Sequence, residues 1–182
     1  MMHILIDTET LSTRINCVIT QIGWCAFDPA SEGVMWHESK CPDVPNQIHV
    51  LGRAIDWETL QWWLQQEEDA RKAMWQARPD CMLNEFLSSF AHQYNWKDVE
   101  GVWSHGLGFD VSILEYAYIK AGMSIPWGYK TPRDTRTLFA LAGMKSEDLI
   151  APSIKHVAEA DAIAMALSVQ KAFRWIKGGE RI

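Results

Sequence analysis

The order of strand-like and helix-like hydrophobic patterns along the chain constrains its fold most strongly. The strand-like apolar runs lie at residues 3–7, 18–27, 34–38 and 100–104, with a predicted turn at 28–33. The helical patterns of the second half lie at residues 110–121, 134–142 and 157–176. Strands that come first and then alternate with helices predict an α/β fold, in which helices are layered on a mixed sheet.

The middle of the chain is predicted to lie outside this regular alternation. Residues 41–56 are expected to form a loop, because Pro42, Pro45 and Gly52 interrupt regular structure. The total length of 182 residues is within the range of about 100 to 200 that is usual for one domain. We therefore expect a single domain over residues 1–182, with 41–80 as a loop-helix insertion.

Two helices are predicted in this middle region from apolar stripes. Trp57, Leu60 and Leu64 share one stripe, which we expect to face the core, whereas Trp62 projects from the opposite side. The second stripe consists of Leu83, Phe86, Leu87 and Phe90. Among the ten tryptophans, Trp62 is the candidate for stacking on a base or for a subunit contact, with burial in the core as the alternative.

Charge and apolar content restrict the partners of the protein. The chain has no apolar run near the ~18 residues that span a bilayer, and its first apolar run reaches Asp7 too early for a signal segment, so we expect a cytoplasmic protein without a membrane partner. The formal charge of −6 argues against nonspecific coating of nucleic acid. The four cysteines show no C-x-x-C pair and predict neither a disulfide framework nor structural zinc.

Two acidic residues follow the first apolar run. Asp7 and Glu9 are two positions apart, so on a strand their carboxylates point to one face while Thr8 points to the other. Carboxylates on one face repel each other unless a cation lies between them. A solvated strand end is the alternative interpretation of this short motif.

Three further polar residues stand where helices are predicted to begin. Asp110 follows Phe109 at the start of a helix, where a helix N-cap is the alternative to a functional role. His156 and Asp161 are five positions apart and cannot share one side of a regular helix, so we expect His156 in an entry loop after Pro152 and Asp161 on the second turn. A structural histidine is the alternative for His156, whereas an inward carboxylate among apolar residues needs a partner.

The ordered set of these motifs is more specific than any single one. Asp7-x-Glu9, Phe109-Asp110 and His156-x4-Asp161, in this order, resemble the three motifs of the DEDDh-type 3'-5' exonucleases over nearly the whole chain. Three further segments are similar to the branch of small bacterial and phage 3'-5' exonucleases and RNase T-like exoribonucleases: Trp62-Trp63-Leu64-Gln65-Gln66, Trp103-Ser104-His105-Gly106 and Arg133-Asp134-Thr135-Arg136-Thr137-Leu138. This branch implies a bacterial or phage-infected cell.

The resemblance implies a ribonuclease H-like fold, with a central mixed sheet of five to six strands flanked by helices. It also implies two Mg²⁺ or Mn²⁺ ions per active site, and hard cations of this kind prefer oxygen ligands. By resemblance, Asp7 bridges the two ions, Glu9 and Asp161 complete one site, and Asp110 supports the other. His156 would accept the proton of the attacking water, because imidazole is a workable base at neutral pH.

The implied reaction hydrolyses the terminal phosphodiester bond at the 3' end of single-stranded RNA or DNA and releases nucleoside 5'-monophosphates. By resemblance, Glu9 and the backbone near Thr10 and Leu11 meet the terminal sugar and base. Relatives often carry Asn where this chain has His105. The expected substrate-binding residues are Thr8, Thr10, Leu11, Trp62, His105, Phe109 and Arg136.

The motifs leave several alternatives open. A noncatalytic nucleic-acid binding module on the same fold is the alternative function. Loss of one of the four acids or of the histidine would favour it, but all five of these residues are present. Arg133 and Arg136 either hold phosphate or form salt bridges. Relatives often pair, so a homodimer is expected. The motifs do not discriminate between RNA and DNA, because this depends on a few contacts to the 2'-hydroxyl.

Overall fold

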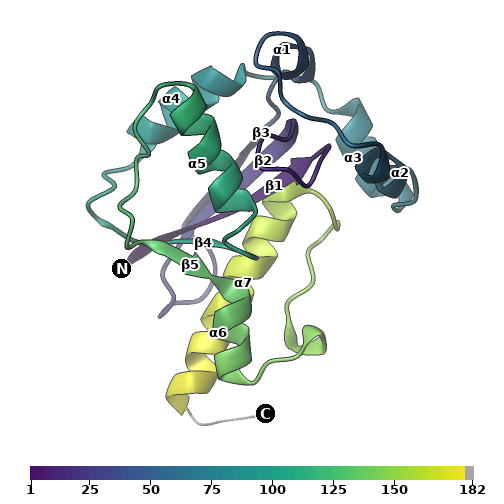
Figure 1. Cartoon of the computed structure of the whole chain (residues 1–182). Helices are drawn as coiled ribbons and strands as arrows, with labels where there is room; N and C mark the ends of the chain where they lie inside the picture. Colours follow the sequence, from purple (N-terminus) through teal and green to yellow (C-terminus); the bar gives the residue numbers. More distant parts are fainter. Residues whose placement is uncertain (179–182) are drawn as a thin grey trace.

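The computed structural model (Figure 1) describes residues 1–178 and contains a five-stranded sheet with the order β3-β2-β1-β4-β5. The strands are β1 (Met2–Thr10), β2 (Ile19–Phe27), β3 (Trp36–Lys40), β4 (Val99–Ser104) and β5 (Pro132–Asp134). β2 is antiparallel to β1 and β3, whereas β4 is parallel to β1 and β5. The predicted mixed sheet is confirmed, with β5 as a strand that the sequence pattern did not reveal.

Helices cover both faces of this sheet. They are α1 (Val44–His49), α2 (Trp57–Leu64), α3 (Glu68–Gln76), α4 (Leu83–Gln93), α5 (Asp110–Lys120), α6 (Thr135–Ala142) and α7 (Ala158–Gly178), with a 3-10 turn η1 (Ser146–Asp148) before α7. α4 and α5 pack on one face, and α6 and α7 pack on the other. The helix predicted at residues 157–176 is therefore confirmed, while Gly179, predicted as part of its stop signal, lies outside the described residues.

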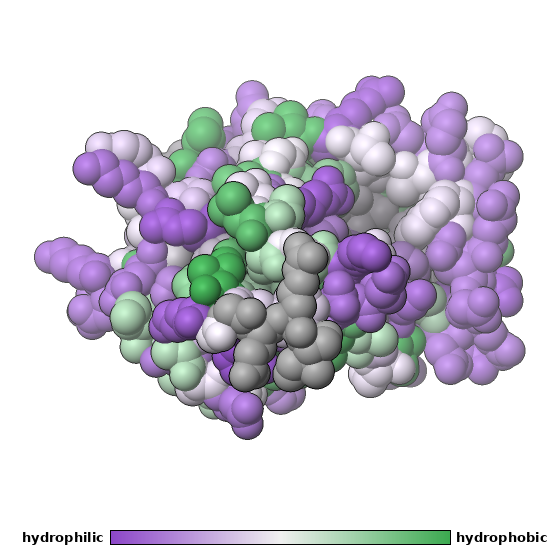
Figure 2. Space-filling view, turned by 90° about the horizontal axis from the view of Figure 1, so that it is seen from below, coloured by the Kyte–Doolittle hydropathy of each residue, from purple (hydrophilic) through white to green (hydrophobic). Residues whose placement is uncertain are grey.

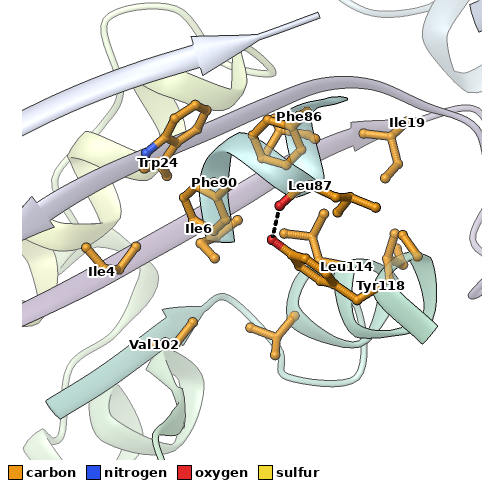
Figure 3. Packing of buried hydrophobic residues seen from close by; sticks show 14 of the residues in the cluster. Ile4, Ile6, Ile19, Trp24, Phe86, Leu87, Phe90, Val102, Leu114 and Tyr118 are labelled. Atoms are coloured by element: carbon orange, nitrogen blue, oxygen red, sulfur yellow. Dashed lines mark hydrogen bonds between the residues drawn. The ribbon is translucent and has the colours of Figure 1, made fainter. Parts of the chain in front are cut away.

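The larger apolar cluster lies between the sheet and the pair α4 and α5. Alternate residues of β1, such as Ile4 and Ile6, point to this side and meet aromatic residues from α4. Figure 3 shows how Tyr118 of α5 reaches Leu87 of α4, where its hydroxyl donates to the backbone oxygen at 2.9 Å. This bond satisfies a buried polar group and joins the two helices above the sheet.

The segment 41–80 packs at one end of β1 through a smaller cluster. Leu11, Val18, Trp63 and Met74 form its buried part. The loop predicted at residues 41–56 is wrong for α1, where Asp43 caps the helix by accepting from Asn46 N at 2.6 Å.

The expected core stripe of α2 is confirmed for Leu60, which packs against this cluster, and is wrong for Trp57 and Leu64. Trp57 is 64% exposed and Leu64 is 59% exposed, whereas Trp63 is only 1% exposed. Trp63 is the tryptophan that turns inward because its indole N–H finds a backbone acceptor there, the oxygen of Thr10 at 2.9 Å.

The end of the molecule that faces the viewer in Figure 2 lies away from α1, α2 and α3. Hydrophilic residues predominate on this end, and apolar residues form small groups between them. Within residues 1–178, the structure holds no helix that combines the length and the apolar character needed to cross a membrane.

Candidate active site

The C-terminal half of β1 extends past its parallel neighbour β4. The pairing between these strands ends at Leu5 and Trp103, whereas β1 remains paired with β2 through Asp7, opposite Gly23, and Glu9, opposite Gln21. Asp7 and Glu9 follow the same alternation as Leu5, which packs under α7, so both carboxylates belong to the α7 face of the sheet.

Asp110, the first residue of α5, meets β1 where β4 no longer covers it. Its Oδ1 accepts two hydrogen bonds from Thr8, one from the backbone N–H at 3.0 Å and one from the hydroxyl at 2.8 Å. The backbone N–H would otherwise be left without a strand partner. The Asp110 side chain is therefore hydrogen-bonded to β1. It does not cap its own helix, because the N-cap position of α5 is Phe109.

The first turn of α7 approaches the sheet directly above the strand pair that carries the acids. A Cβ built on Gly23 would lie 2.1 Å from the backbone carbon of Ala158, so only glycine permits this approach. Beside it, Gln21 accepts from Ala158 N at 3.4 Å and donates to Ala73 O at 3.0 Å. Gly23 and Gln21 are positioning residues that the sequence motifs did not identify.

His156 and Asp161 reach the acids from this end of α7. His156 lies in the entry loop, as expected, with a left-handed backbone at φ 60° that is unusual for a residue other than glycine. Asp161 lies in the first turn of α7, not the second, and its Oδ2 accepts from Val157 N at 3.1 Å. Glu9, His156 and Asp161 each offer a ligand atom within 4.8 Å of the others.

Burial raises the pKa values of all four carboxyl groups, and repulsion from the neighbouring acids adds to the rise at Asp7 and Glu9. Burial is the main cause at Asp7, whose pKa lies well above its usual range, and Asp110, Glu9 and Asp161 add repulsion. Burial and the charges of Asp161 and Asp110 raise the pKa of Glu9 to about 8. Burial also raises the pKa of Asp110 to about 6, against the opposing effect of the two Thr8 bonds. Four carboxyl groups at one strand end therefore disfavour full ionisation unless positive charge joins them.

This donor set fits divalent cations. The available ligand atoms are carboxylate oxygens and one imidazole nitrogen, and oxygen-rich sets suit Mg²⁺ and Mn²⁺. A divalent cation at these oxygens would offset the repulsion that raises the pKa values of Asp7 and Glu9.

A cavity of about 570 Å³ opens beside Glu9. Of the residues expected to contact substrate, Thr8, Thr10, Trp62 and Phe109 line this cavity. Trp62 is 42% exposed, and its ring lies 4.9 Å from that of His156 in an edge-to-face arrangement. The cavity thus has an aromatic wall next to the imidazole.

The other residues expected to contact substrate lie elsewhere. Leu11 is 3% exposed in the cluster around Trp63 and does not line the cavity, because its side chain completes that cluster. His105 contacts α6, where its Nδ1 lies 2.8 Å from Thr135 Oγ1, and burial lowers its pKa. Arg136 is exposed, and its guanidinium lies beside Gly106, 3.3 Å from the position that a Cβ on this glycine would take. Its positive charge opposes the rise in the pKa of Asp110.

Within the described residues, Arg133 forms no salt bridge. Its Nη1 donates to the backbone oxygens of Lys130 at 2.5 Å and Pro132 at 3.0 Å. The guanidinium therefore secures the approach to β5, and Arg136 is the arginine of this segment that lies close to the acids.

A model of the Rv2179c-like 3'-5' exoribonuclease domain matches residues 2–173 of the chain. No curated protein sequence matches it. Among solved structures, E. coli exonuclease I in complex with a dT13 oligonucleotide is similar with a TM-score of 0.64 and 13% identity, over 93% of this chain and 40% of that chain. The chain thus spans about two fifths of the length of exonuclease I.

Two further structures share the fold. The nuclease domain of 3'hExo, a DEDDh family member bound to rAMP, is similar with a TM-score of 0.57 and 10% identity, over 97% of this chain and 92% of that chain. Cell-death related nuclease 4 is similar with a TM-score of 0.53 and 10% identity, over 95% of this chain and 64% of that chain. These similarities confirm the predicted ribonuclease H-like fold. The match over residues 2–173 shows that the chain belongs to the Rv2179c-like 3'-5' exoribonuclease domain family.

Proposed function

We propose that the protein is a 3'-5' exonuclease that hydrolyses the terminal phosphodiester bond of single-stranded RNA or DNA and releases nucleoside 5'-monophosphates. The observation that supports this most strongly is the approach of Glu9, His156 and Asp161 within 4.8 Å, on the face of β1 that also carries Asp7. Membership of an exoribonuclease domain family supports the activity independently and favours RNA.

In this proposal, Asp7, Glu9, Asp110 and Asp161 hold two Mg²⁺ or Mn²⁺ ions. Such ions, when bound, stabilise the charge that develops on a phosphoryl group and make water more acidic. The need for a cation is supported by the raised pKa values of the buried carboxyl groups. Thr8 holds Asp110 in place, and Gly23 allows α7 to bring Asp161 to the same strand end.

His156 would accept the proton of the attacking water. Its place in the entry loop leaves the ring free of the helix, and contacts with the rings of Trp62 at 4.9 Å and Trp63 at 6.0 Å orient it. A positioned base of this kind typically contributes about 10² to 10⁴ in rate.

The cavity beside Glu9 would receive the terminal nucleotide. Trp62 offers an exposed ring for stacking, and Thr10 and Phe109 lie on the same lining. The relatives with known structures include complexes with a dT13 oligonucleotide and with rAMP, which supports a single-stranded end as the ligand. A homodimer and a cytoplasmic location in a bacterial or phage-infected cell stay predictions.

The test is incubation of 5'-labelled single-stranded RNA and DNA oligonucleotides with Mn²⁺ or with EDTA. We expect stepwise shortening from the 3' end in Mn²⁺ and intact oligonucleotide in EDTA. An Asp161→Asn variant purified in parallel controls for contaminating nuclease. Binding of oligonucleotide without shortening under all metal conditions would instead support the noncatalytic binding module.

A further inference from the structure

A second cavity, of about 440 Å³, lies between the loop before α2, the start of α4 and the last turns of α5. Its charged lining residues in the described part of the chain are two cations, Arg53 and Lys120. Asn16, Asn84 and Tyr116 add polar side chains. The composition contrasts with the first cavity, whose lining includes the acids Glu9, Asp56 and Glu58.

Arg53 carries a buried charge without a counter-ion. The residue is 8% exposed, its Nε donates to Cys17 O at 2.5 Å, and its Nη2 is buried with no hydrogen-bond partner. Over residues 1–178, no carboxylate oxygen lies within 4.0 Å of its guanidinium. Burial also lowers its pKa. Buried charges are normally paired, so this position favours an anion from outside the chain.

Lys120 is the second cation of this cavity without an acid beside it. Its Nζ lies 5.5 Å from the centre of the Tyr116 ring, and within the described part of the chain it forms no salt bridge. Asn84, in the first turn of α4, adds an amide side chain that can donate to an anion in this cavity. Each of these features favours a negatively charged ligand.

Two short stretches of chain, residues 13–16 and 53–56, each contribute lining residues to both cavities. Thr13 lines the first cavity and Asn16 the second, and in the same way Asp56 lines the first and Arg53 the second. A backbone bond from Ala54 N to Asn16 O at 2.8 Å holds the two stretches together. On each stretch, the lining residues of the two cavities are three positions apart, so a strand that starts at Glu9 and follows these stretches would reach the cationic cavity.

We propose that the second cavity binds a phosphate group, with Arg53 and Lys120 as its cations. Two sources supply this chemistry. One is an internal phosphate of the strand whose 3' end enters the first cavity, an assignment that rests on the function proposed above. The other is a free phosphate or mononucleotide.

Three variants that each remove one positive charge test the proposal. Arg53→Met keeps an unbranched side chain, Lys120→Met changes an exposed residue, and Lys145→Met, at a lysine that is 76% exposed and outside the cavity, controls for net charge. Fluorescence anisotropy in EDTA measures the affinity for long and very short single-stranded oligonucleotides without cleavage. Thermal melting with inorganic phosphate or a nucleoside 5'-monophosphate measures the free ligands.

If the strand supplies the phosphate, Arg53→Met and Lys120→Met each weaken binding of the long oligonucleotide by about 10-fold. They also reduce the slope of log affinity against log salt concentration by about 1. Binding of the shortest oligonucleotide by these variants, and binding by the Lys145→Met protein, stay at the wild-type level. If a free ligand supplies it, phosphate or mononucleotide raises the Tm of the wild type but not of Arg53→Met. The proposal would be overturned if both variants bound the long oligonucleotide as tightly as the wild type and if phosphate changed the Tm of Arg53→Met as much as that of the wild type. Absence of cleavage by the wild type in Mn²⁺ would contradict the exonuclease alone.

Discussion

Thr8 and Asp110, which are 102 residues apart in the chain, are joined by two hydrogen bonds to one carboxylate oxygen. The bonds fix the start of α5 against β1 at the point where β4 no longer pairs with it. The position of Asp110 relative to Asp7 and Glu9 therefore depends on a residue that points to the opposite face of the strand.

Replacement of Thr8 by valine tests this dependence. The variant keeps the backbone bond and the shape of the side chain but loses the hydroxyl bond at 2.8 Å. Loss of a group that orients a metal ligand typically costs about 10- to 100-fold in activity or metal affinity, and we expect a loss of this size in single-turnover hydrolysis. Thr8→Ser should retain most of the rate. A wild-type rate in a folded Thr8→Val protein would show that Asp110 is held by other means.

Replacement of Gly23 by alanine tests the approach of α7. The new Cβ would meet the backbone of Ala158 at 2.1 Å, so helix and sheet must separate. We expect the free energy of unfolding to fall by about 1 to 3 kcal/mol, the usual range for overpacking, together with most of the hydrolytic activity. Gly128→Ala is the matched control, because no atom lies within 4 Å of its added Cβ. Equal denaturant midpoints for the two variants would contradict the close contact.

The raised pKa of Glu9 predicts the pH dependence of stability in metal-free protein. The folded protein keeps a proton on Glu9 up to about pH 8, whereas the unfolded chain releases it near its ordinary value of 4.5. Stability is therefore greatest below the unfolded pKa and decreases as the pH rises through this window. Melting in EDTA should show this decrease, and Mn²⁺ should raise the Tm more at the alkaline end. Glu9→Gln should reduce the decrease without abolishing it, because the raised pKa of Asp7 acts in the same direction, and a wild-type Tm independent of pH would refute the cause.

The contact between Trp62 and His156 predicts a role for Trp62 in substrate binding. Trp62→Ala should weaken binding of single-stranded oligonucleotide by about 1 to 3 kcal/mol, the usual contribution of one stacked base. Trp57→Ala, at a tryptophan that is 64% exposed and does not line the cavity, should leave affinity unchanged. Anisotropy measurements in EDTA compare the two. Equal losses in both variants would indicate general contact with the α2 surface rather than stacking beside His156.

The sequence predicted those parts of the fold that depend on local pattern. The alternation that places Asp7 and Glu9 on one face, the loop position of His156 and the long C-terminal helix all follow from short-range periodicity. β5 could not be predicted, because it is only three residues long and begins with Pro132. α3 is largely polar and buries only Ala70 and Met74, so its apolar stripe is weak.

Contacts between residues distant in the chain could not be predicted from the sequence. Neither the bond from Thr8 to Asp110 nor the approach of α7 to Gly23 leaves a local pattern, since each joins a strand to a helix that is distant in the sequence. The orientation of α2 was predicted wrongly for the same reason. Trp63 turns inward because the backbone oxygen of Thr10 accepts its indole N–H, and that oxygen belongs to another element.

Calorimetric titration of the metal-free protein with Mn²⁺ tests most directly whether Asp7, Glu9, Asp110 and Asp161 form one cation site. We predict two bound ions per chain at neutral pH for the wild type. Asp7→Asn should lose both ions, because the family resemblance implies that Asp7 would contribute to holding each of them, and circular dichroism should show that the fold is retained. Unchanged Mn²⁺ binding in folded Asp7→Asn protein, or no binding by the wild type, would contradict the site.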